Sequence, residues 1–325
     1  MKPLLYSFSL LLLFLTGACH KKPAVQKEQA ATFRVSGYLL GHNSWHTLLD
    51  QIDMDKITDL NIAFINPDST GTFSVNEGLH QVMEAARKKN VRTFMSIGGG
   101  LAPAHLGEMI SAPHRKQYIA GLLQVCQQFG FDGIDVDLEN DLINADYPAF
   151  VAELDAALDE KKLLMTAALA SWNGHKIADS TLARYDVINI MSYDKTGPWA
   201  PTRPGQHSPY EMAEADFRYY HEERGIPAHK LLIGLPFYGY GFGGNAPTSI
   251  RYHEIISTYP AAAEKDEINL SDGGTIYYNG RATIGRKVQF ALDRKAGGIM
   301  IWELKQDSRN EQSLLRLIHD MIRNP

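Results

Sequence analysis

The pattern of apolar and polar positions divides most of the chain into two alternating kinds of segment. From Phe33 onward, short runs rich in β-branched and other apolar residues alternate with longer stretches whose apolar positions recur at helical spacing. This alternation is typical of repeated βα units that build a parallel sheet. The strand-like runs are residues 33–40, 57–65, 91–97, 131–137, 163–169, 187–191, 231–235 and 298–302.

The stretches between these runs predict amphipathic helices at residues 75–89, 114–129, 147–161, 211–224 and 284–295. The first ends on Arg87, Lys88, Lys89 and Asn90, which places cations at the negative end of the helix dipole and predicts a capped end rather than a binding patch. Eight βα units predict a (β/α)8 TIM barrel, which usually has about 250 residues plus insertions. A doubly wound sheet also alternates strands and helices, but the number of runs favours the barrel.

The residues at the ends of the predicted strands also favour the barrel. Active sites of such barrels form where the carboxyl ends of the strands meet, so we predict a binding site there. The residues at or just past these ends are Tyr38, Asn66, Ser96, Asp137, Ser192, Phe237 and Trp302.

The segment 131–141 carries an unusual set of carboxyl groups. Side chains alternate between the faces of a strand, so Asp135, Asp137 and Glu139 project to one side and the aliphatic residues between them to the other. We expect the aliphatic side to face the helices and the carboxyls to lie inside the barrel. Burial and mutual repulsion there raise the pKa of at least one carboxyl. A carboxylic acid that is neutral at neutral pH can serve as a general acid.

Two other interpretations of this segment are weaker. A solvated edge strand would turn its acids outward, but strands of a doubly covered parallel sheet are not exposed in this way. A calcium loop of the EF-hand type needs a glycine at its sixth place, where this chain has Asn140, and the interleaved aliphatic residues suit a strand better.

Composition narrows the class of protein. The chain has 325 residues, of which 44% are hydrophobic and 21% charged, so it can bury a substantial core. Its 32 basic and 37 acidic side chains give a net charge of −5, and no basic tail is present to track a phosphate backbone. Nucleic acid is therefore not an expected partner. We also expect the protein to be a monomer.

The N-terminus predicts export. The apolar run 4–15 is shorter than the roughly 20 residues that span a bilayer, so residues 1–18 are interpreted as a signal peptide. Thr16, Gly17, Ala18 and Cys19 resemble a bacterial lipobox, although the usual leucine lies one residue further out, at Leu15. We expect lipidation at Cys19, a flexible tether over 19–32 and a catalytic domain over 33–325. The protein would be a membrane-anchored lipoprotein, periplasmic or on the cell surface; the alternative is plain cleavage and secretion.

Other chemical motifs are incomplete. Cys126 lies at an apolar position of a helical pattern, which indicates a small buried side chain. His42 and His46 have no third ligand nearby in sequence, so no metal site is predicted. Residues 239–244 contain G-x-G-x-x-G, but no helix-opening pattern follows, so dinucleotide binding is not predicted. No cofactor is expected.

Several motifs together resemble glycoside hydrolase family 18. Residues 132–139 are similar to its D-G-x-D-x-D-x-E signature, residues 96–99 to S-x-G-G, residues 191–194 to M-x-Y-D and residues 235–239 to L-P-F-Y-G. Residues 297–302 resemble the family's last strand. These motifs occur in order and cover nearly all of residues 33–307.

The resemblance implies a substrate-assisted retaining mechanism, in which the acetamido oxygen of the sugar acts as nucleophile. The resemblance implies that Glu139 is the acid and base, that Asp137 binds the acetamido N–H, and that Asp135 lies behind Asp137. It implies that the substrate contacts Tyr193, through its hydroxyl, and Trp302, as a floor under the sugar.

The same resemblance implies further residues around this subsite. Tyr38 and Ser96 would hydrogen-bond Asp135, and Met191, Asp194 and Tyr238 would line the subsite. Trp199, in a loop after the sixth predicted strand, is interpreted as a sugar-stacking platform. Tyr38, Met191, Tyr238, Trp302 and Trp199 could each instead serve only packing.

Differences from the usual family pattern bear on specificity. Gly100 and Leu138 stand where tryptophan is often found, and Asn140-Asp141 where Tyr-Pro is often found, which thins the aromatic lining. Residues 240–296 are shorter than a full-size inserted α+β domain needs, so we expect a shallow cleft.

We predict an endo-acting hydrolase of β-1,4-linked N-acetylglucosamine, in chitin or its oligosaccharides. The alternatives are an endo-β-N-acetylglucosaminidase acting on the chitobiose core of N-glycans and a non-catalytic chitin-binding lectin.

Overall fold

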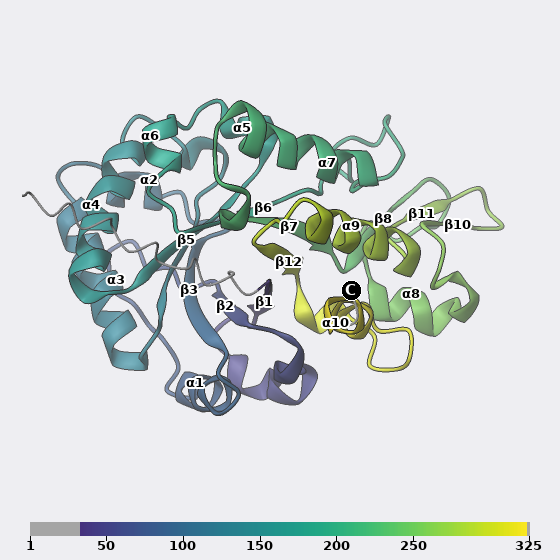
Figure 1. Cartoon of the computed structure of the whole chain (residues 1–325), viewed down its shortest axis with the longest axis horizontal. Helices are drawn as coiled ribbons and strands as arrows, with labels where there is room; N and C mark the ends of the chain where they lie inside the picture. The colour runs from purple at the N-terminus through teal and green to yellow at the C-terminus, as the bar shows by residue number, and fades with distance from the viewer. Residues whose placement is uncertain (1–32, 324–325) are drawn as a thin grey trace, which may run out of the picture. The chain divides into compact units, whose positions relative to one another are not determined.

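The computed structural model describes residues 33–323, which form a closed barrel of parallel strands (Figure 1). Neighbouring strands follow the order β1-β12-β7-β6-β5-β4-β3-β2, so the chain's last barrel strand pairs with its first. The predicted (β/α)8 barrel is confirmed, and each predicted run overlaps one of its strands, with β3 and β7 each ending one residue later than predicted. The strands are β1 (Arg34–Leu40), β2 (Asp59–Ala63), β3 (Arg92–Gly98), β4 (Gly133–Asp137), β5 (Leu164–Leu169), β6 (Val187–Ile190), β7 (Leu231–Pro236) and β12 (Gly298–Trp302). The predictions for residues 1–32 lie outside the described residues.

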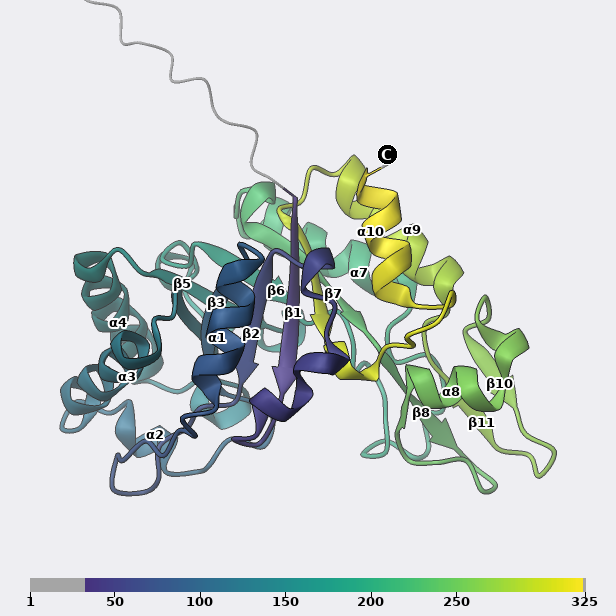
Figure 2. The same ribbon diagram turned by 90° about the horizontal axis from the view of Figure 1, so that it is seen from below.

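Helices surround the strands, as Figure 2 shows for α1, α3, α4, α7, α9 and α10. Each predicted helix has a counterpart, and α10, which follows the last strand, was not predicted. The longer helices are α1 (Leu79–Lys88), α3 (Arg115–Phe129), α4 (Tyr147–Lys161), α7 (Tyr210–Arg218), α9 (Arg281–Asp293) and α10 (Leu314–Arg323). Short helices are α2 (Leu106–Met109), α5 (Ser171–Gly174), α6 (Asp179–Leu182) and α8 (Tyr252–Thr258). Among the described helices, none is both long and apolar enough to span a membrane.

The first predicted helix starts later than expected and ends where expected. The helix begins at Leu79, four residues later than expected, because the Asn76 side chain accepts a hydrogen bond from the Gly78 N–H and holds a turn there. Its C-terminal end agrees with the prediction: Asn90 has a φ of 55°, a left-handed conformation that asparagine tolerates well.

Two apolar layers explain the alternation within the strands. Ile134, Val136 and Leu138 are fully buried in the large core between the strands and the helices. A second, smaller cluster fills the barrel interior, so inward-facing and outward-facing residues alternate along each strand as expected. This interior cluster consists of Tyr38, Ala63, Ala168, Val187, Tyr193, Leu232 and Met300.

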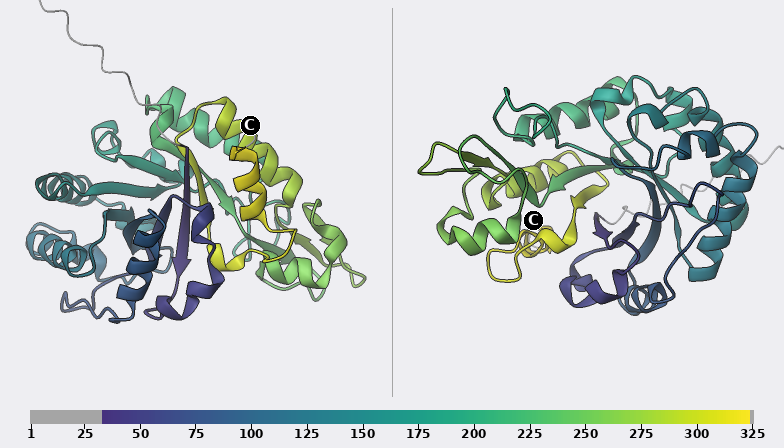
Figure 3. Two further views of the ribbon diagram at one scale, coloured as in Figure 1. Left: turned by 60° about the horizontal axis from the view of Figure 1, so that its bottom comes forward. Right: turned by 180° about the vertical axis from the view of Figure 1, so that it is seen from behind.

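A small inserted unit lies between β7 and α9, and Figure 3 shows it beside the barrel. Its antiparallel sheet has the order β10-β11-β8-β9, and α8 accompanies it. The segment that we expected to be too short for a full-size inserted domain thus forms a compact α+β unit. Its strands are β8 (Tyr238–Phe242), β9 (Ile250–Arg251), β10 (Glu267–Asn269) and β11 (Thr275–Tyr277).

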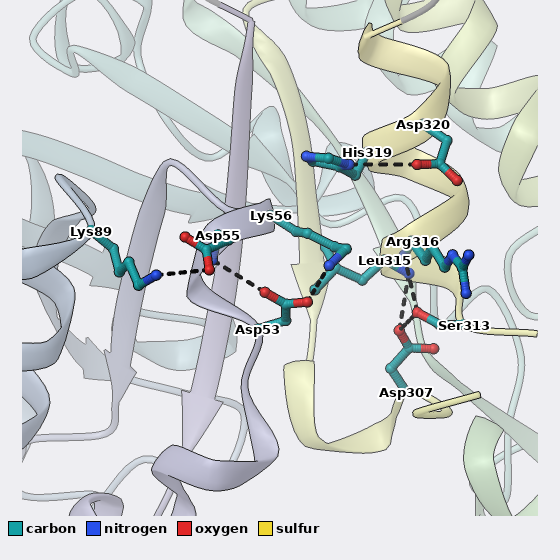
Figure 4. A network of polar contacts seen from close by, with 10 residues as sticks. All are labelled: Asp53, Asp55, Lys56, Lys89, Asp307, Ser313, Leu315, Arg316, His319 and Asp320. Atoms are coloured by element: carbon teal, nitrogen blue, oxygen red, sulfur yellow. Dashed lines mark hydrogen bonds and ion pairs between the residues drawn. The ribbon is translucent and has the colours of Figure 1, made fainter. Parts of the chain in front are cut away.

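Polar contacts fix the start of α10 (Figure 4). The buried Asp307 carboxylate accepts hydrogen bonds from the Leu315 N–H at 3.0 Å and from the Ser313 hydroxyl at 2.7 Å. These bonds satisfy a backbone donor that has no partner within the helix. The last helix is therefore anchored to the loop that leaves β12.

Candidate active site

Asp135 lies at the base of the site, inside the barrel and fully buried. Four side chains donate hydrogen bonds to its carboxylate, from β1, β3, β5 and β6. Burial raises the pKa of Asp135, and these hydrogen bonds oppose the rise. The donors are the Tyr38 hydroxyl at 2.7 Å, the Ser96 hydroxyl at 2.8 Å, the Thr166 hydroxyl at 2.6 Å and the Asn189 amide at 3.2 Å.

Asp137 is the last residue of β4, and Glu139 follows two residues beyond it, towards the mouth of the barrel. Asp137 is buried, and its Oδ1 atom has no hydrogen-bond partner among the described residues. Burial, followed by the charges of Glu139 and Asp135, raises the pKa of Asp137 well above its usual value. Burial, followed by the charge of Asp194, raises the pKa of Glu139 to about 7. Glu139 can therefore hold a proton at neutral pH and release it, as acid and base catalysis requires.

The glycine segment after β3 packs directly against these carboxyls. The Gly99 N–H donates a 2.7 Å hydrogen bond to the Asp137 carbonyl. Gly98 has a φ of 96°, and a Cβ atom there would lie 2.1 Å from that same carbonyl oxygen, so only glycine fits. A Cβ atom on Gly100 would lie 3.3 Å from Glu139 Oε1. Gly98, Gly99 and Gly100 thus shape the wall beside Asp137 and Glu139.

Asp194 forms a second polar cluster at the mouth, in the loop after β6. Its Oδ1 atom accepts hydrogen bonds from the Tyr238 hydroxyl at 2.6 Å and the Tyr240 hydroxyl at 3.1 Å. The Nδ1 atom of the buried His207 lies 3.4 Å from the same oxygen. The charge of Asp194 acts on Glu139, which connects this cluster to the carboxyls of β4.

Aromatic side chains gather at the same end of the barrel as the carboxyls. Trp302, at the end of β12, has its ring centroid 5.3 Å from that of Tyr38 and 5.8 Å from that of Phe64. The buried Tyr193 hydroxyl points at the Met300 sulfur, 3.7 Å away. Met191 is half-buried and packs, like Trp302, against the interior cluster. The structure therefore brings the predicted residues Tyr38, Met191, Tyr193 and Trp302 together at one end of the barrel.

Trp199 lies further out on the same face. Its side chain is exposed, and its ring meets the edge of the Tyr240 ring at a centroid distance of 5.4 Å. Tyr240 in turn contacts Asp194, so the exposed tryptophan is linked to the predicted subsite through one side chain.

Five residues of the site were not predicted. Thr166 and Asn189 were visible as polar residues inside otherwise apolar strands, a signal that could have identified them as partners of a buried group. Phe64, His207 and Tyr240 carried no such signal, because only the folded chain brings them next to Trp302 and Asp194.

This set of groups fits acid and base chemistry. A half-buried carboxyl with a pKa of about 7 lies beyond a buried carboxyl, and the rings of Tyr38 and Trp302 contact each other at the same end of the barrel. Over residues 33–323, no group of three or more His, Cys, Asp or Glu side chains could hold a metal ion. These carboxyls lie at the C-terminal face, where barrel enzymes assemble their active sites, and paired carboxyls are the catalytic groups of glycosidases.

The chain belongs to the glycosyl hydrolases family 18, whose sequence profile matches residues 34–307. The structure is similar to that of the GH18 chitinase ChiB from the chitin utilization locus of Flavobacterium johnsoniae. That likeness has a TM-score of 0.83 and 37% sequence identity, and it covers 90% of this chain and 95% of the other. A chitinase from Bacteroides thetaiotaomicron is also similar, with a TM-score of 0.78 and 29% identity over 89% of this chain and 96% of that one.

Curated relatives are longer than this chain. A probable endochitinase of Caenorhabditis elegans is 32% identical over 279 residues, which is 68% of this chain and 44% of the relative. Probable chitinase 10 of Drosophila melanogaster is 25% identical over 68% of this chain, which corresponds to 12% of its own length. The chain thus spans less than half of either relative.

Proposed function

We propose that this protein is an endo-acting hydrolase of β-1,4-linked N-acetylglucosamine, in chitin or chito-oligosaccharides, with a substrate-assisted retaining mechanism. The observation that carries the proposal is the order of Asp135 and Asp137 on β4 and Glu139 two residues beyond its end, from full burial to partial exposure. The likeness to a chitinase from a chitin utilization locus supports chitin as the substrate class.

Glu139 is the proposed acid and base. Its carboxyl protonates the glycosidic oxygen, the bond between that oxygen and the anomeric carbon breaks, and the acetamido oxygen of the same sugar attacks the carbon. The resulting carboxylate then removes a proton from water as the water opens the oxazolinium ring. A pKa of about 7 leaves both forms of Glu139 populated at neutral pH, which both half-reactions need.

Asp137 is the proposed partner of the acetamido N–H. Its Oδ1 atom is buried and has no partner among the described residues, so an amide N–H would supply a missing hydrogen bond. A carboxylate there also stabilises the positive charge of the oxazolinium ring. Asp135 lies behind it and is held by four donors, which fixes the position of the strand end.

The residues around this centre bind the sugar. Tyr193 is proposed to turn its hydroxyl from the Met300 sulfur, a weak acceptor, to the acetamido oxygen. Trp302 forms the floor under the sugar ring. Met191, Asp194 and Tyr238 line the subsite, and Trp199 is an outer stacking platform, because its exposed ring lies next to Tyr240.

The products of two substrates test this proposal. Residues 33–325 are mixed separately with a hexamer of N-acetylglucosamine and with a high-mannose glycopeptide, and the products are weighed by mass spectrometry. Release of internal fragments of the hexamer, dimers and trimers before monomers, supports an endo-acting chitinase. A glycopeptide that retains one N-acetylglucosamine would move the function to the N-glycan core. A hexamer that is bound but not cut would indicate a lectin.

We also propose that the chain is exported and anchored through a lipid on Cys19. The lipobox-like residues before Cys19 support this proposal, and the tether 19–32 would carry the domain away from the membrane. The test is metabolic labelling with a radioactive fatty acid in a bacterial host, with Cys19→Ser as the control. Label on the native chain and none on the variant supports lipidation. No label on either chain would indicate plain secretion.

A further inference from the structure

Asn66 is a polar residue near the mouth of the barrel that the proposed reaction does not yet use. It lies just beyond the end of β2 and is half-buried. Its side-chain amide makes two hydrogen bonds to a single residue, Gly98, which is the last residue of β3. The Gly98 N–H donates to Asn66 Oδ1 at 2.7 Å, and Asn66 Nδ2 donates to the Gly98 carbonyl at 2.9 Å. Only this orientation of the amide gives both backbone groups of Gly98 a partner.

These two bonds extend the pairing of β2 with β3 past the end of the strand ladder. The paired register ends at Ile62 and Met95, and the Ile65 N–H then donates a 2.9 Å hydrogen bond to the Ser96 carbonyl. The Asn66 amide makes the next contact along β3. A side-chain amide carries the same donor and acceptor as a peptide group, so it can take the place of a backbone partner. Asn66 therefore holds the end of β3 from the side of β2.

On its other side, the end of β3 contacts the strand that carries the carboxyls. Gly98 is in register with Asp137, the last residue of β4. The next residue, Gly99, donates its N–H to the Asp137 carbonyl at 2.7 Å. The two backbones are in close contact here, because a Cβ atom on Gly98 would lie 2.1 Å from the same carbonyl oxygen. A displacement of Gly98 would therefore displace the end of β4, from which Asp137 and Glu139 extend.

The segment that carries Asn66 also contacts Trp302, the proposed floor under the sugar. The Phe64 ring stacks against the Trp302 ring at a centroid distance of 5.8 Å. A Cβ atom on Gly99 would lie 2.4 Å from the Phe64 ring, so the glycine packs directly on that ring. The segments 64–66 and 98–99 are thus joined both by packing and by hydrogen bonds.

We propose that Asn66 is a positioning residue of the reaction. Its amide fixes Gly98, and the hydrogen bond between Gly99 and Asp137 passes this restraint on to the end of β4. Asp137 and Glu139 must keep their relative positions to act on one sugar, and a misplacement of about 1 Å can cost about 100-fold in rate. The role in catalysis rests on the proposed function, but the coupling of Asn66 to the bond between Gly99 and Asp137 does not.

Amide hydrogen exchange, followed by nuclear magnetic resonance on the full chain, tests this coupling without any substrate. In Asn66→Ala the Gly99 N–H keeps its acceptor, the Asp137 carbonyl, so its exchange rate reports whether Asn66 holds that bond in place. We expect the Gly99 N–H to exchange about tenfold faster than in the native chain, because the end of β3 opens more often. Unchanged exchange at Gly99 overturns the proposal, whether or not the chain cleaves chitin.

Asn43→Ala is the matched control for this measurement. Asn43 is also half-buried, and its amide likewise bonds backbone groups, donating to the Ser74 carbonyl at 3.1 Å and accepting from the Asn76 N–H at 2.6 Å. The control therefore loses the same two kinds of hydrogen bond, but to residues outside β3 and β4. It should leave the exchange at Gly99 unchanged. An equal rise in both variants would indicate a general loss of stability and overturn the coupling.

Asn66→Asp separates the hydrogen bonds from the packing of the side chain. This variant keeps nearly the same volume, but an oxygen replaces the donor that faces the Gly98 carbonyl, and two acceptors repel each other. We expect faster exchange at Gly99 here too. Fast exchange in Asn66→Ala together with native exchange in Asn66→Asp would assign the effect to lost packing and overturn the role of the amide.

The effect on the reaction should be a loss of kcat with little change in binding. On the N-acetylglucosamine hexamer, Asn66→Ala should lower kcat by about 10- to 100-fold and change KM by less than about twofold. When Asn66→Ala is added to Glu139→Gln, calorimetry should show hexamer binding as tight as in Glu139→Gln alone. Weakened binding would make Asn66 a sugar contact, and unchanged kcat and binding would leave it a packing residue. Either result overturns the positioning role.

Discussion

The hydroxyl of Tyr38, on β1, donates a 2.7 Å hydrogen bond to Asp135, on β4. Because β2 and β3 lie between these strands in the barrel, the bond crosses the barrel interior rather than joining neighbours. Burial, followed by the charge of Asp135, raises the pKa of Tyr38 well above its usual value, so the phenol remains a donor. One buried carboxylate thus ties together strands from distant parts of the chain, and the catalytic proposal depends on that arrangement.

Replacing the proposed acid should abolish most turnover. In Glu139→Gln the side chain keeps its shape but cannot transfer a proton, so we expect kcat on the N-acetylglucosamine hexamer to fall by about 10² to 10⁴. Binding of the hexamer, measured by calorimetry, should change little. Glu84→Gln, which alters an exposed glutamate of α1, is the matched control. Turnover that survives in Glu139→Gln would remove Glu139 from the mechanism.

The pH dependence of activity should report the protonation of Glu139. A general acid works in its protonated form, so kcat/KM should decline as the pH rises through about 7. The sign follows because burial and the charge of Asp194 raise this pKa and keep the proton on Glu139 to higher pH. The residual activity of Glu139→Gln should lack this limb. A decline centred near pH 4.5, the ordinary value for glutamate, would contradict the raised pKa.

The donors around Asp135 should contribute to stability. Thr166→Val keeps the shape of the side chain and removes one of the four hydrogen bonds to the buried carboxylate. We expect the free energy of unfolding to fall by about 1 to 2 kcal/mol, because a buried charged acceptor loses a partner. Urea denaturation measures the loss. The control is Thr47→Val, at an exposed threonine whose hydroxyl donates a hydrogen bond to the Ser44 carbonyl, and its free energy of unfolding should fall clearly less. Equal losses of unfolding free energy in both variants would show that the hydrogen bond to Asp135 does not contribute more than an exposed one.

Trp302 should matter for binding rather than only for packing. In the Glu139→Gln background, where the ligand is not cut, Trp302→Ala should weaken hexamer binding by about tenfold, which corresponds to about 1.4 kcal/mol. Trp302→Phe retains an aromatic face against Tyr38 and Phe64 and should bind more tightly than the alanine variant. Calorimetry compares the three proteins. Unweakened binding in Trp302→Ala would return this residue to the core.

Trp199 should act on long substrates. It is 58% exposed, so Trp199→Ala should leave the unfolding temperature nearly unchanged. We expect a severalfold higher KM for the hexamer and a smaller change for the trimer, because a short chain need not reach the outer platform. Trp172→Ala is the matched control. Trp172 is 57% exposed on α5, and no ring contact between it and Tyr240 is found among the described residues. Equal effects of both variants would assign no special role to Trp199.

The sequence by itself determined the barrel and the line of carboxyls. Periodicity located all eight strands because strands covered on both faces must be apolar for several residues in succession. The alternation of acids and aliphatics along residues 133–139 fixed which side chains face inward, because the two faces of a strand differ by one residue. Both patterns lie within single segments of the chain, so they can be recognised without knowledge of the fold.

Only the tertiary structure decided which distant residues meet. The helix α10 and the small sheet around β8 escaped prediction because their short or late segments depend on contacts with the rest of the chain. Thr166 and Asn189 reach Asp135, and His207 reaches Asp194, only because barrel closure brings separate strands and loops together. A pKa depends on burial and on charges in space, so the raised pKa of Glu139 follows from that closure and not from the order of residues.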